Sequence, residues 1–107
     1  MRISLSCMRN AVIGKLPIEQ QESLYTSLSV LLKGCTHELA TDRYLSGVRA
    51  DIRNVLAFHA QTWGVPELAH VPIYILLHPD GGRLMALVDA ENPPLSQWLA
   101  EGWVLKS

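Results

Sequence analysis

Residues 71–89 read VPIYILLHPDGGRLMALVD, and this stretch decides the fold of the chain. Two apolar runs, 71–78 and 83–89, flank the sequence Pro79-Asp80-Gly81-Gly82. Proline fixes φ, aspartate favours a turn and glycine accepts a positive φ, so this segment is predicted to reverse the chain. The two runs are rich in branched residues, and together with the turn they predict a β-hairpin.

Both faces of the predicted hairpin are apolar. Side chains alternate across a strand, so the first run puts Ile73, Ile75 and Leu77 on one face and Tyr74 and Leu76 on the other. The second run repeats the pattern, with Leu84, Ala86 and Val88 on one face and Met85 and Leu87 on the other. A sheet with one face in water would alternate apolar and polar residues instead. We therefore expect cover on both faces, from helices on two sides or from a second chain.

Two amphipathic helices are predicted before the hairpin. The first spans about 17–33, with Pro17 in its first turn and Gly34 as the stop. The second spans 41–63, capped by Thr41 unless it begins nearer Thr36, and it ends at Gly64. Its apolar arc consists of Tyr44, Leu45, Val48, Ile52, Val55, Leu56, His59 and Trp63. Since the connector between the helices is short, they are expected to pack as an antiparallel pair.

The remaining segments complete one domain over residues 1–107. Residues 2–8 alternate apolar and hydroxyl side chains and predict a strand, followed by a connector over 10–15. After the hairpin, residues 94–101 predict a short helix and 103–105 a last edge strand. The predicted fold is α+β in the order β-α-α-β-β-α-β. A small, mostly antiparallel sheet packs against the helical pair, and a short C-terminal helix is added.

Charge is scarce for a chain of 107 residues. Charged residues make up 18% and hydrophobic residues 49%, with a net charge of −1. A typical soluble domain has about 25% charged residues, and its surface is kept soluble by them. The balance excludes disorder and a polyanion-binding chain, and it predicts that some apolar surface is buried against a partner. Trp63, Trp98 and Trp103 are the interface candidates, because tryptophan is enriched where binding energy concentrates.

Two arginines on one flank of the second helix are candidates for binding an anion or a partner. Arg49 and Arg53 carry guanidinium groups that fit carboxylate and phosphate. Glu38 and Asp42 lie on the same flank, and a compensated row of charges is the alternative interpretation.

Among the histidine and cysteine residues, the sequence indicates at most a ligand pocket at His59. His59 lies within the apolar arc, which predicts either a core imidazole bonded to a carbonyl or a pocket residue. His70 and His78 flank the first hairpin strand and are expected to face solvent. Cys35 and His37 lack the spacing of a zinc site. No metal, cofactor or catalytic set is therefore expected.

The leading hypothesis is a non-enzymatic protein-interaction module of the inhibitor, immunity, chaperone-like or adaptor type, which self-associates. A small ligand-binding protein or enzyme, with a pocket between the helical pair and the sheet, is the alternative. A third hypothesis is a nucleic-acid-binding accessory protein using Arg2, Arg9 and Lys15, but three charges are a small basic patch and nucleic acid is not the expected partner. Two cysteines far apart in the sequence favour reduced thiols and a cytoplasmic location, and no membrane-spanning run is expected.

Overall fold

A central sheet of four strands organises the chain. The structure is a computed structural model that describes residues 3–6, 12–32, 41–78, 83–89 and 94–106. The strands are β1 (Ile3–Ser6), β2 (Ile73–His78), β3 (Arg83–Val88) and β4 (Val104–Leu105), in the spatial order β1-β3-β2-β4. β2 pairs antiparallel with both β3 and β4, while β1 runs parallel to β3. The α+β class, the element order and the mostly antiparallel sheet predicted from the sequence are confirmed.

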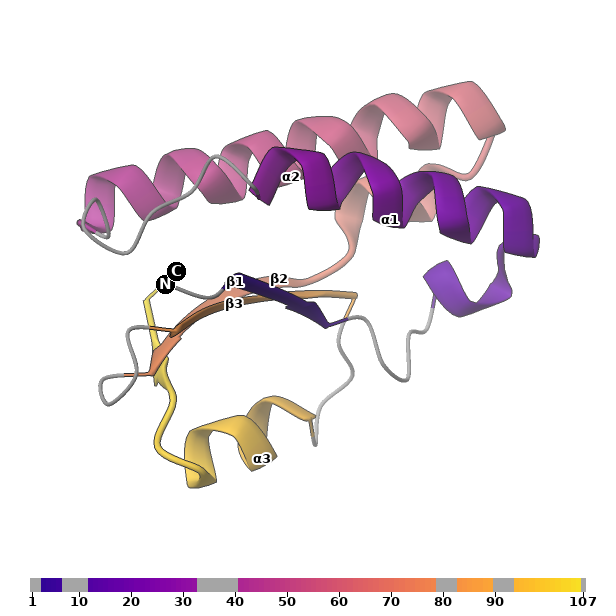
Figure 1. Ribbon diagram of the computed structural model, residues 1–107. Helices are drawn as coiled ribbons and strands as arrows, with labels where there is room; N and C mark the ends of the chain where they lie inside the picture. The colour runs from indigo at the N-terminus through magenta and orange to yellow at the C-terminus, as the bar shows by residue number, and fades with distance from the viewer. Residues whose placement is uncertain (1–2, 7–11, 33–40, 79–82, 90–93, 107) are drawn as a thin grey trace.

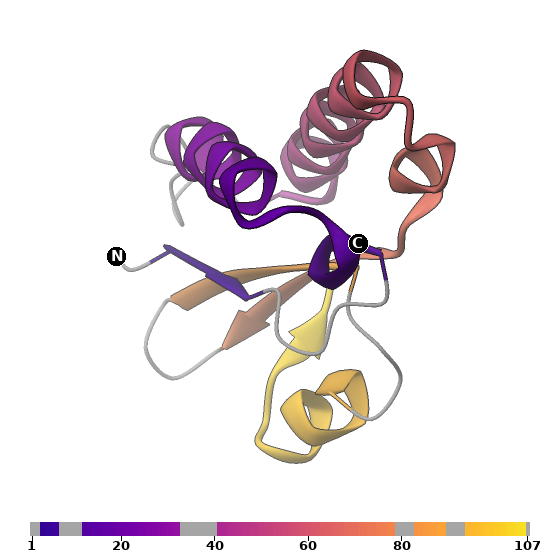
Figure 2. The same cartoon turned by 90° about the vertical axis from the view of Figure 1, so that its right-hand side faces the viewer.

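Helices cover the sheet on both sides. Helices α1 (Ile18–Leu32) and α2 (Asp42–Trp63) lie side by side over one face, and α3 (Pro94–Ala100) lies under the other (Figures 1 and 2). The two apolar faces of the hairpin are thus covered within a single chain, at least over β2 and β3.

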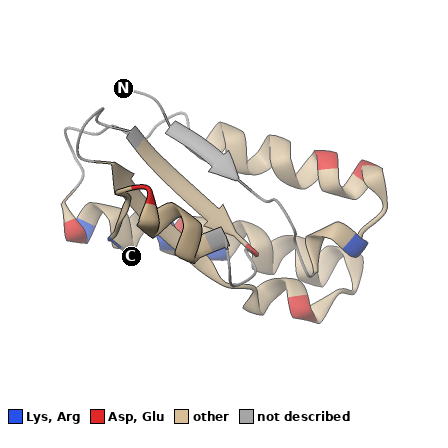
Figure 3. Cartoon of the chain, turned by 90° about the horizontal axis from the view of Figure 1, so that it is seen from below, with Lys and Arg blue, Asp and Glu red and all other residues tan. Residues whose placement is uncertain are grey.

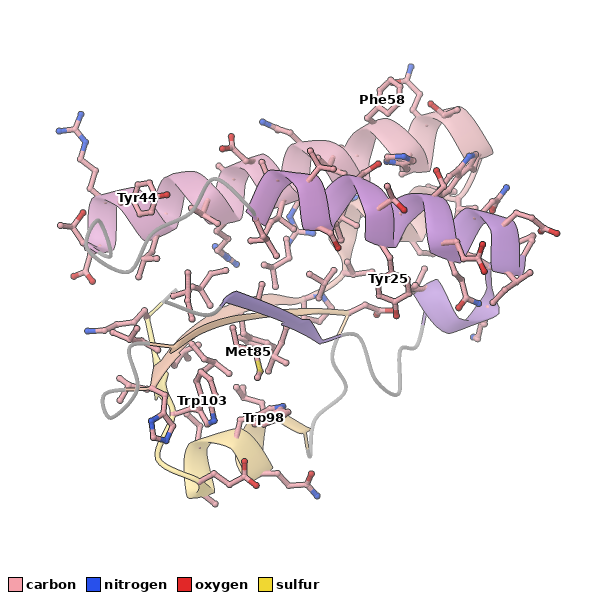
Figure 4. All side chains as sticks on the ribbon, viewed as in Figure 1. Tyr25, Tyr44, Phe58, Met85, Trp98 and Trp103 are labelled. Carbon is pink, nitrogen blue, oxygen red and sulfur yellow. The ribbon has the colours of Figure 1, made fainter. Side chains whose placement is uncertain are left out.

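Strand alternation divides the buried side chains into two cores. Ile73, Ile75 and Val88 are at most 1% exposed and pack beneath the helical pair, together with Leu28 and Ile52. On the opposite face, the smaller core consists of Leu76, Met85, Leu87 and Trp103, with Tyr74, Leu95 and Trp98 packed against it. Figure 4 shows Met85, Trp98 and Trp103 between the sheet and α3. The alternation predicted for the hairpin therefore matches the structure residue by residue.

Helix α2 begins and ends where its sequence predicts. The hydroxyl of Thr41 accepts a hydrogen bond from the main-chain N–H of Tyr44 at 3.2 Å, which satisfies one orphan donor of the first turn. Gly64 adopts the left-handed conformation, with φ 68°, and its N–H donates to the carbonyl of Ala60. The alternative start near Thr36 and the hairpin turn at 79–82 lie outside the described residues.

Two 3₁₀ helices were not predicted, η1 (Ile13–Lys15) and η3 (Pro66–His70). The N-terminal end of η1 is held by Asp89, whose carboxylate accepts from the N–H groups of Val12 and Ile13 at 2.8 and 2.7 Å. Asp89 is 2% exposed and has a φ of 56°. A contact across more than seventy residues leaves no local signal in the sequence, which explains why η1 was expected to be a plain connector.

The expectation that His78 faces solvent is wrong. His78 is only 9% exposed, and the edge of its ring lies against the indole of Trp103 with the ring centroids 5.0 Å apart. Gly102 approaches the same imidazole, because a Cβ at that position would lie 3.6 Å from its Nε2 atom. The turn between α3 and β4 thus covers the end of β2. His70, by contrast, is exposed as expected.

Candidate interaction surface

A groove of about 550 Å³ opens between the end of α1 and the first half of α2. The described residues that line it are Leu31, Thr41, Arg43, Tyr44, Gly47, Val48 and Asp51. The space between the helical pair and the sheet is different, because Leu24, Leu28, Leu45 and Leu56 fill it with side chains that are at most 1% exposed. The groove therefore lies on the outer side of the pair, away from the sheet.

The second half of α1, from which Leu31 lines the groove, carries no charge. Residues 23–32 of α1 contain no Asp, Glu, Lys or Arg, and the acids of this helix stand near its beginning (Figure 3). Val30, next to the lining residue Leu31, is 64% exposed. A solvated helix face carries charged or polar residues. The exposed positions of this stretch are the hydroxyl residues Ser23, Thr26 and Ser29 and the apolar Val30, so it is polar but uncharged.

Two hydroxyls on this part of α1 donate to carbonyls of their own helix. Thr26 Oγ1 donates to the carbonyl of Glu22 at 2.9 Å, and Ser27 Oγ donates to that of Ser23 at 3.1 Å. A buried donor without an acceptor costs free energy. Since these donors have their acceptors within the helix, this face of α1 can be covered without leaving either hydroxyl proton unpaired.

Gly47 stands at an exposed position in the first half of α2. A Cβ built at Gly47 would meet no atom within 4 Å, so neither packing against the described residues nor a positive φ requires glycine there. Glycine inside a helix costs about 0.5–1 kcal/mol relative to alanine. Its steric effect is to leave the main chain of α2 open to close approach at this position.

Arg43 and Asp51 flank Gly47 on the same side of α2. They lie four residues before and four residues after it, and all three line the groove. Positions four apart on a helix share a face. Eight residues of helix separate the two charges by about 12 Å along the axis, too far for them to pair with each other. Phe58, 65% exposed, continues the outer side of α2, and Figure 4 shows it pointing away from the sheet.

A second, smaller cleft of about 490 Å³ lies at the other end of the helical pair. It is lined by Val12, Lys15, Leu16, Pro17, Gln20, Trp63, Val65 and Glu67. Trp63, predicted at an interface, is half-buried here, and the ring of His59 lies 4.6 Å from its indole, centroid to centroid. The other two interface candidates line neither cleft and lie in the smaller core between the sheet and α3.

Trp98 and Trp103 pack against each other with centroids 6.0 Å apart and their planes nearly perpendicular. Trp103 is 6% exposed within this single chain, so little of it remains for a partner to cover, whereas Trp98 is half-buried. The structure brings two of the three tryptophans together and leaves Trp63 apart. Their placement at an interface stays a prediction.

Arg49 and Arg53 bind main-chain carbonyls. Arg53 Nη1 donates to the carbonyls of Ala69 and Val71 at 3.0 and 2.7 Å, and Arg49 Nε donates to that of Ile73 at 3.4 Å. Burial lowers the pKa of the Arg53 guanidinium, and the positive charge of Arg49 lowers it further. These contacts tie α2 to the beginning of β2. Anion or partner binding by the two arginines stays a prediction.

The two arginines complete the outer edge of β2. Along this edge, the carbonyls of Val71 and Ile73 accept from Arg53 and Arg49, and the carbonyl of Ile75 accepts from the N–H of Lys106 at 2.8 Å. Beyond that point β4 pairs with Leu76 and Leu77. An unpaired sheet edge attracts other strands. Here arginine side chains cover the part of the edge that the short β4 does not reach.

His59 has the carbonyl contact expected of a structural imidazole. Its Nδ1 atom lies 2.8 Å from the carbonyl oxygen of Val55, one turn earlier, and the residue is half-buried. His59 is absent from the lining of both clefts. A pocket role for His59 stays a prediction.

The other candidates from the sequence fall in part outside the described residues, namely Arg2, Cys7, Arg9, Cys35, His37 and Glu38. Within the described part of the chain, no three His, Cys, Asp or Glu side chains come together in a way that could hold a metal ion. None of the helices in that part has the length and apolarity needed to cross a bilayer.

Comparison of the chain with known protein families, with curated proteins and with solved structures gives no match. The residues of the groove were not selected from the sequence as a site. Two signals for them are nevertheless visible there: the uncharged run 23–32, and a glycine in the middle of a predicted helix.

Proposed function

We propose that this chain is a non-enzymatic protein-interaction module of the inhibitor, immunity, chaperone-like or adaptor type. It acts in the cytoplasm and binds its partner through the groove between α1 and α2. The observation that carries the proposal is Gly47, an exposed glycine inside a helix, placed in a groove whose other wall is uncharged. A close-packed helix or strand of a partner protein accounts for both features, because each favours dry contact with another main chain.

The bonded hydroxyls of Thr26 and Ser27 support a protein partner over a soluble metabolite. A polar ligand needs free donors and acceptors that fix its orientation. The outer side of α1 instead offers short side chains, two of which donate within the helix, together with the exposed methyl groups of Val30. Binding to such a surface is stabilised mainly by the exclusion of water over a broad area.

The test introduces a charged side chain into the uncharged stretch 23–32 of α1. Val30→Asp leaves folding intact, since the side chain is 64% exposed, and it places a carboxylate next in sequence to Leu31, which lines the groove. The matched control is Ile18→Asp, at a position 60% exposed in the first turn of the same helix and outside the groove. Each protein is isolated from the native host, and the polypeptide bound to it in fixed proportion is quantified. Loss with Val30→Asp alone supports the proposal, and equal retention by both variants overturns it.

Ligand binding is the second candidate, and the cleft at Trp63 is the observation that favours it. A volume near 490 Å³ suits a small molecule, and Lys15 and Glu67 offer opposite charges beside the indole. Native mass spectrometry of the host-purified chain tests this candidate. A small bound mass that disappears in Trp63→Ala supports it, and its absence from the unaltered protein rules it out.

A further inference from the structure

We propose that the groove is occupied by a second copy of this chain, with α2 packed antiparallel against α2 of its partner about a two-fold axis at Gly47. This inference rests on the proposed function and names the partner. It draws on one feature that a general interaction surface does not need, the order of the charges along the exposed side of α2.

A two-fold axis through Gly47 sets a simple rule for an antiparallel pair: each residue that precedes Gly47 faces the residue that follows it by the same number of positions. Arg43, four residues before Gly47, then faces Asp51 of the second copy, and Asp51 faces the second Arg43. The contact is isologous, as most homodimer contacts are. One pair of residues in the sequence thus supplies two ion pairs in the dimer.

The residues between the two charges fit the same packing. Gly47 meets its own copy at the centre, where the absence of a side chain permits a close approach. Tyr44, which lines the groove, lies three residues before the axis and faces the exposed, small Ala50 of the second copy. A large side chain opposite a small one allows the two helices to interdigitate.

The charges of the surrounding surface favour self-association too. Two copies of a surface that carries net charge of one sign repel each other. The groove carries one cation and one anion at equal distances from its centre, and residues 23–32 of α1 carry neither.

Charge exchange tests this arrangement. Arg43→Glu places an acidic side chain opposite Asp51 at both ends of the α2 pair. Asp51→Lys places a basic side chain opposite Arg43. Each change is expected to raise the dimer dissociation constant by roughly tenfold or more, because like charges in contact are strongly disfavoured. When the two purified variants are mixed, each altered residue faces its opposite charge, so a one-to-one heterodimer with an affinity close to that of the unaltered dimer is expected.

The measurement is analytical ultracentrifugation of each variant alone, of the equimolar mixture and of the unaltered chain. Glu101→Lys, at an exposed position outside both clefts, is the control and should dimerise as the unaltered chain does. Weak self-association of both variants with recovery in the mixture supports the proposal. An unaltered chain that is monomeric at all concentrations, or a mixture that does not associate, overturns it. In those cases a different protein bound through Val30 would still uphold the proposed function, so the two failures are distinguishable.

Discussion

The carboxylate of Asp89 accepts a hydrogen bond of 2.7 Å from the main-chain N–H of Ile13, and both residues are almost fully buried. This contact joins the end of the hairpin to the segment that leads into α1. A second bond, from the N–H of Val12 to the same oxygen, completes the cap of η1. The position of α1, and with it one wall of the groove, depends on a carboxylate at the far end of the sequence.

Replacing Asp89 should therefore destabilise the whole fold. Asp89→Ala removes the acceptor and leaves a buried N–H unpaired, at a cost of about 2–4 kcal/mol in the free energy of unfolding. Asp89→Asn, which keeps one acceptor oxygen and tolerates the positive φ, should cost less. Urea denaturation of both variants measures the difference. Asp89→Gly separates the causes, since it relieves the backbone without restoring the bond. A glycine variant as stable as the parent would contradict the account.

The arginine that binds the edge of β2 makes a second prediction. Arg53→Met keeps an apolar chain of similar length but removes the donors to Ala69 and Val71, so the free energy of unfolding should fall by about 1–2 kcal/mol. Arg49→Met serves as the comparison. Its single bond is longer, at 3.4 Å, and the residue is exposed, so the loss should be smaller. Thermal unfolding of the two variants side by side tests the ranking, which equal stabilities would refute.

Gly47→Ala should stabilise the isolated chain. The added methyl group meets no atom within 4 Å, and alanine is favoured over glycine inside a helix by about 0.5–1 kcal/mol. Chemical denaturation at low protein concentration, where self-association does not contribute, measures this gain. A loss of stability would show that glycine is needed for folding, and the argument for a partner at this position would then fail.

His59→Leu should leave partner binding unchanged. The imidazole bonds a carbonyl within its own helix and lines neither cleft, so the change should move the free energy of unfolding by no more than about 1 kcal/mol. The variant is compared with the unaltered chain in the same partner-isolation assay. Loss of the partner from a folded His59→Leu protein would transfer the site to the end of the helical pair where Trp63 lies.

Local patterns in the sequence were sufficient to predict most of the fold. The hairpin, both ends of α2 and the two apolar faces of β2 depend on neighbouring residues, and the structure matches each of them. The short helix η1 and the burial of His78 depend on Asp89, Gly102 and Trp103, which approach only after folding. Contacts of this kind are not visible as periodicity.

The candidate site was harder to predict than the fold. Tryptophan and arginine drew attention because such residues often bind partners, yet Trp103 is buried in the smaller core and Arg53 holds two carbonyls of its own chain. The groove instead includes features without reactive or charged groups, such as Gly47 and the uncharged end of α1. Their exposure is visible only in the structure, where Gly47 and Val30 are both exposed.

Native mass spectrometry of the untagged chain purified from its host, beside Gly47→Phe, tests the central claim most directly. A phenylalanine at this exposed position is expected to be tolerated by the fold, because a Cβ there meets no atom within 4 Å. Its side chain prevents another main chain from approaching α2 closely. The account predicts that the unaltered chain carries a second polypeptide, at twice 11.9 kDa if the partner is another copy, and that Gly47→Phe is found at 11.9 kDa alone. An unaltered chain found only as a bare monomer, or a Gly47→Phe protein that keeps its partner, would contradict it.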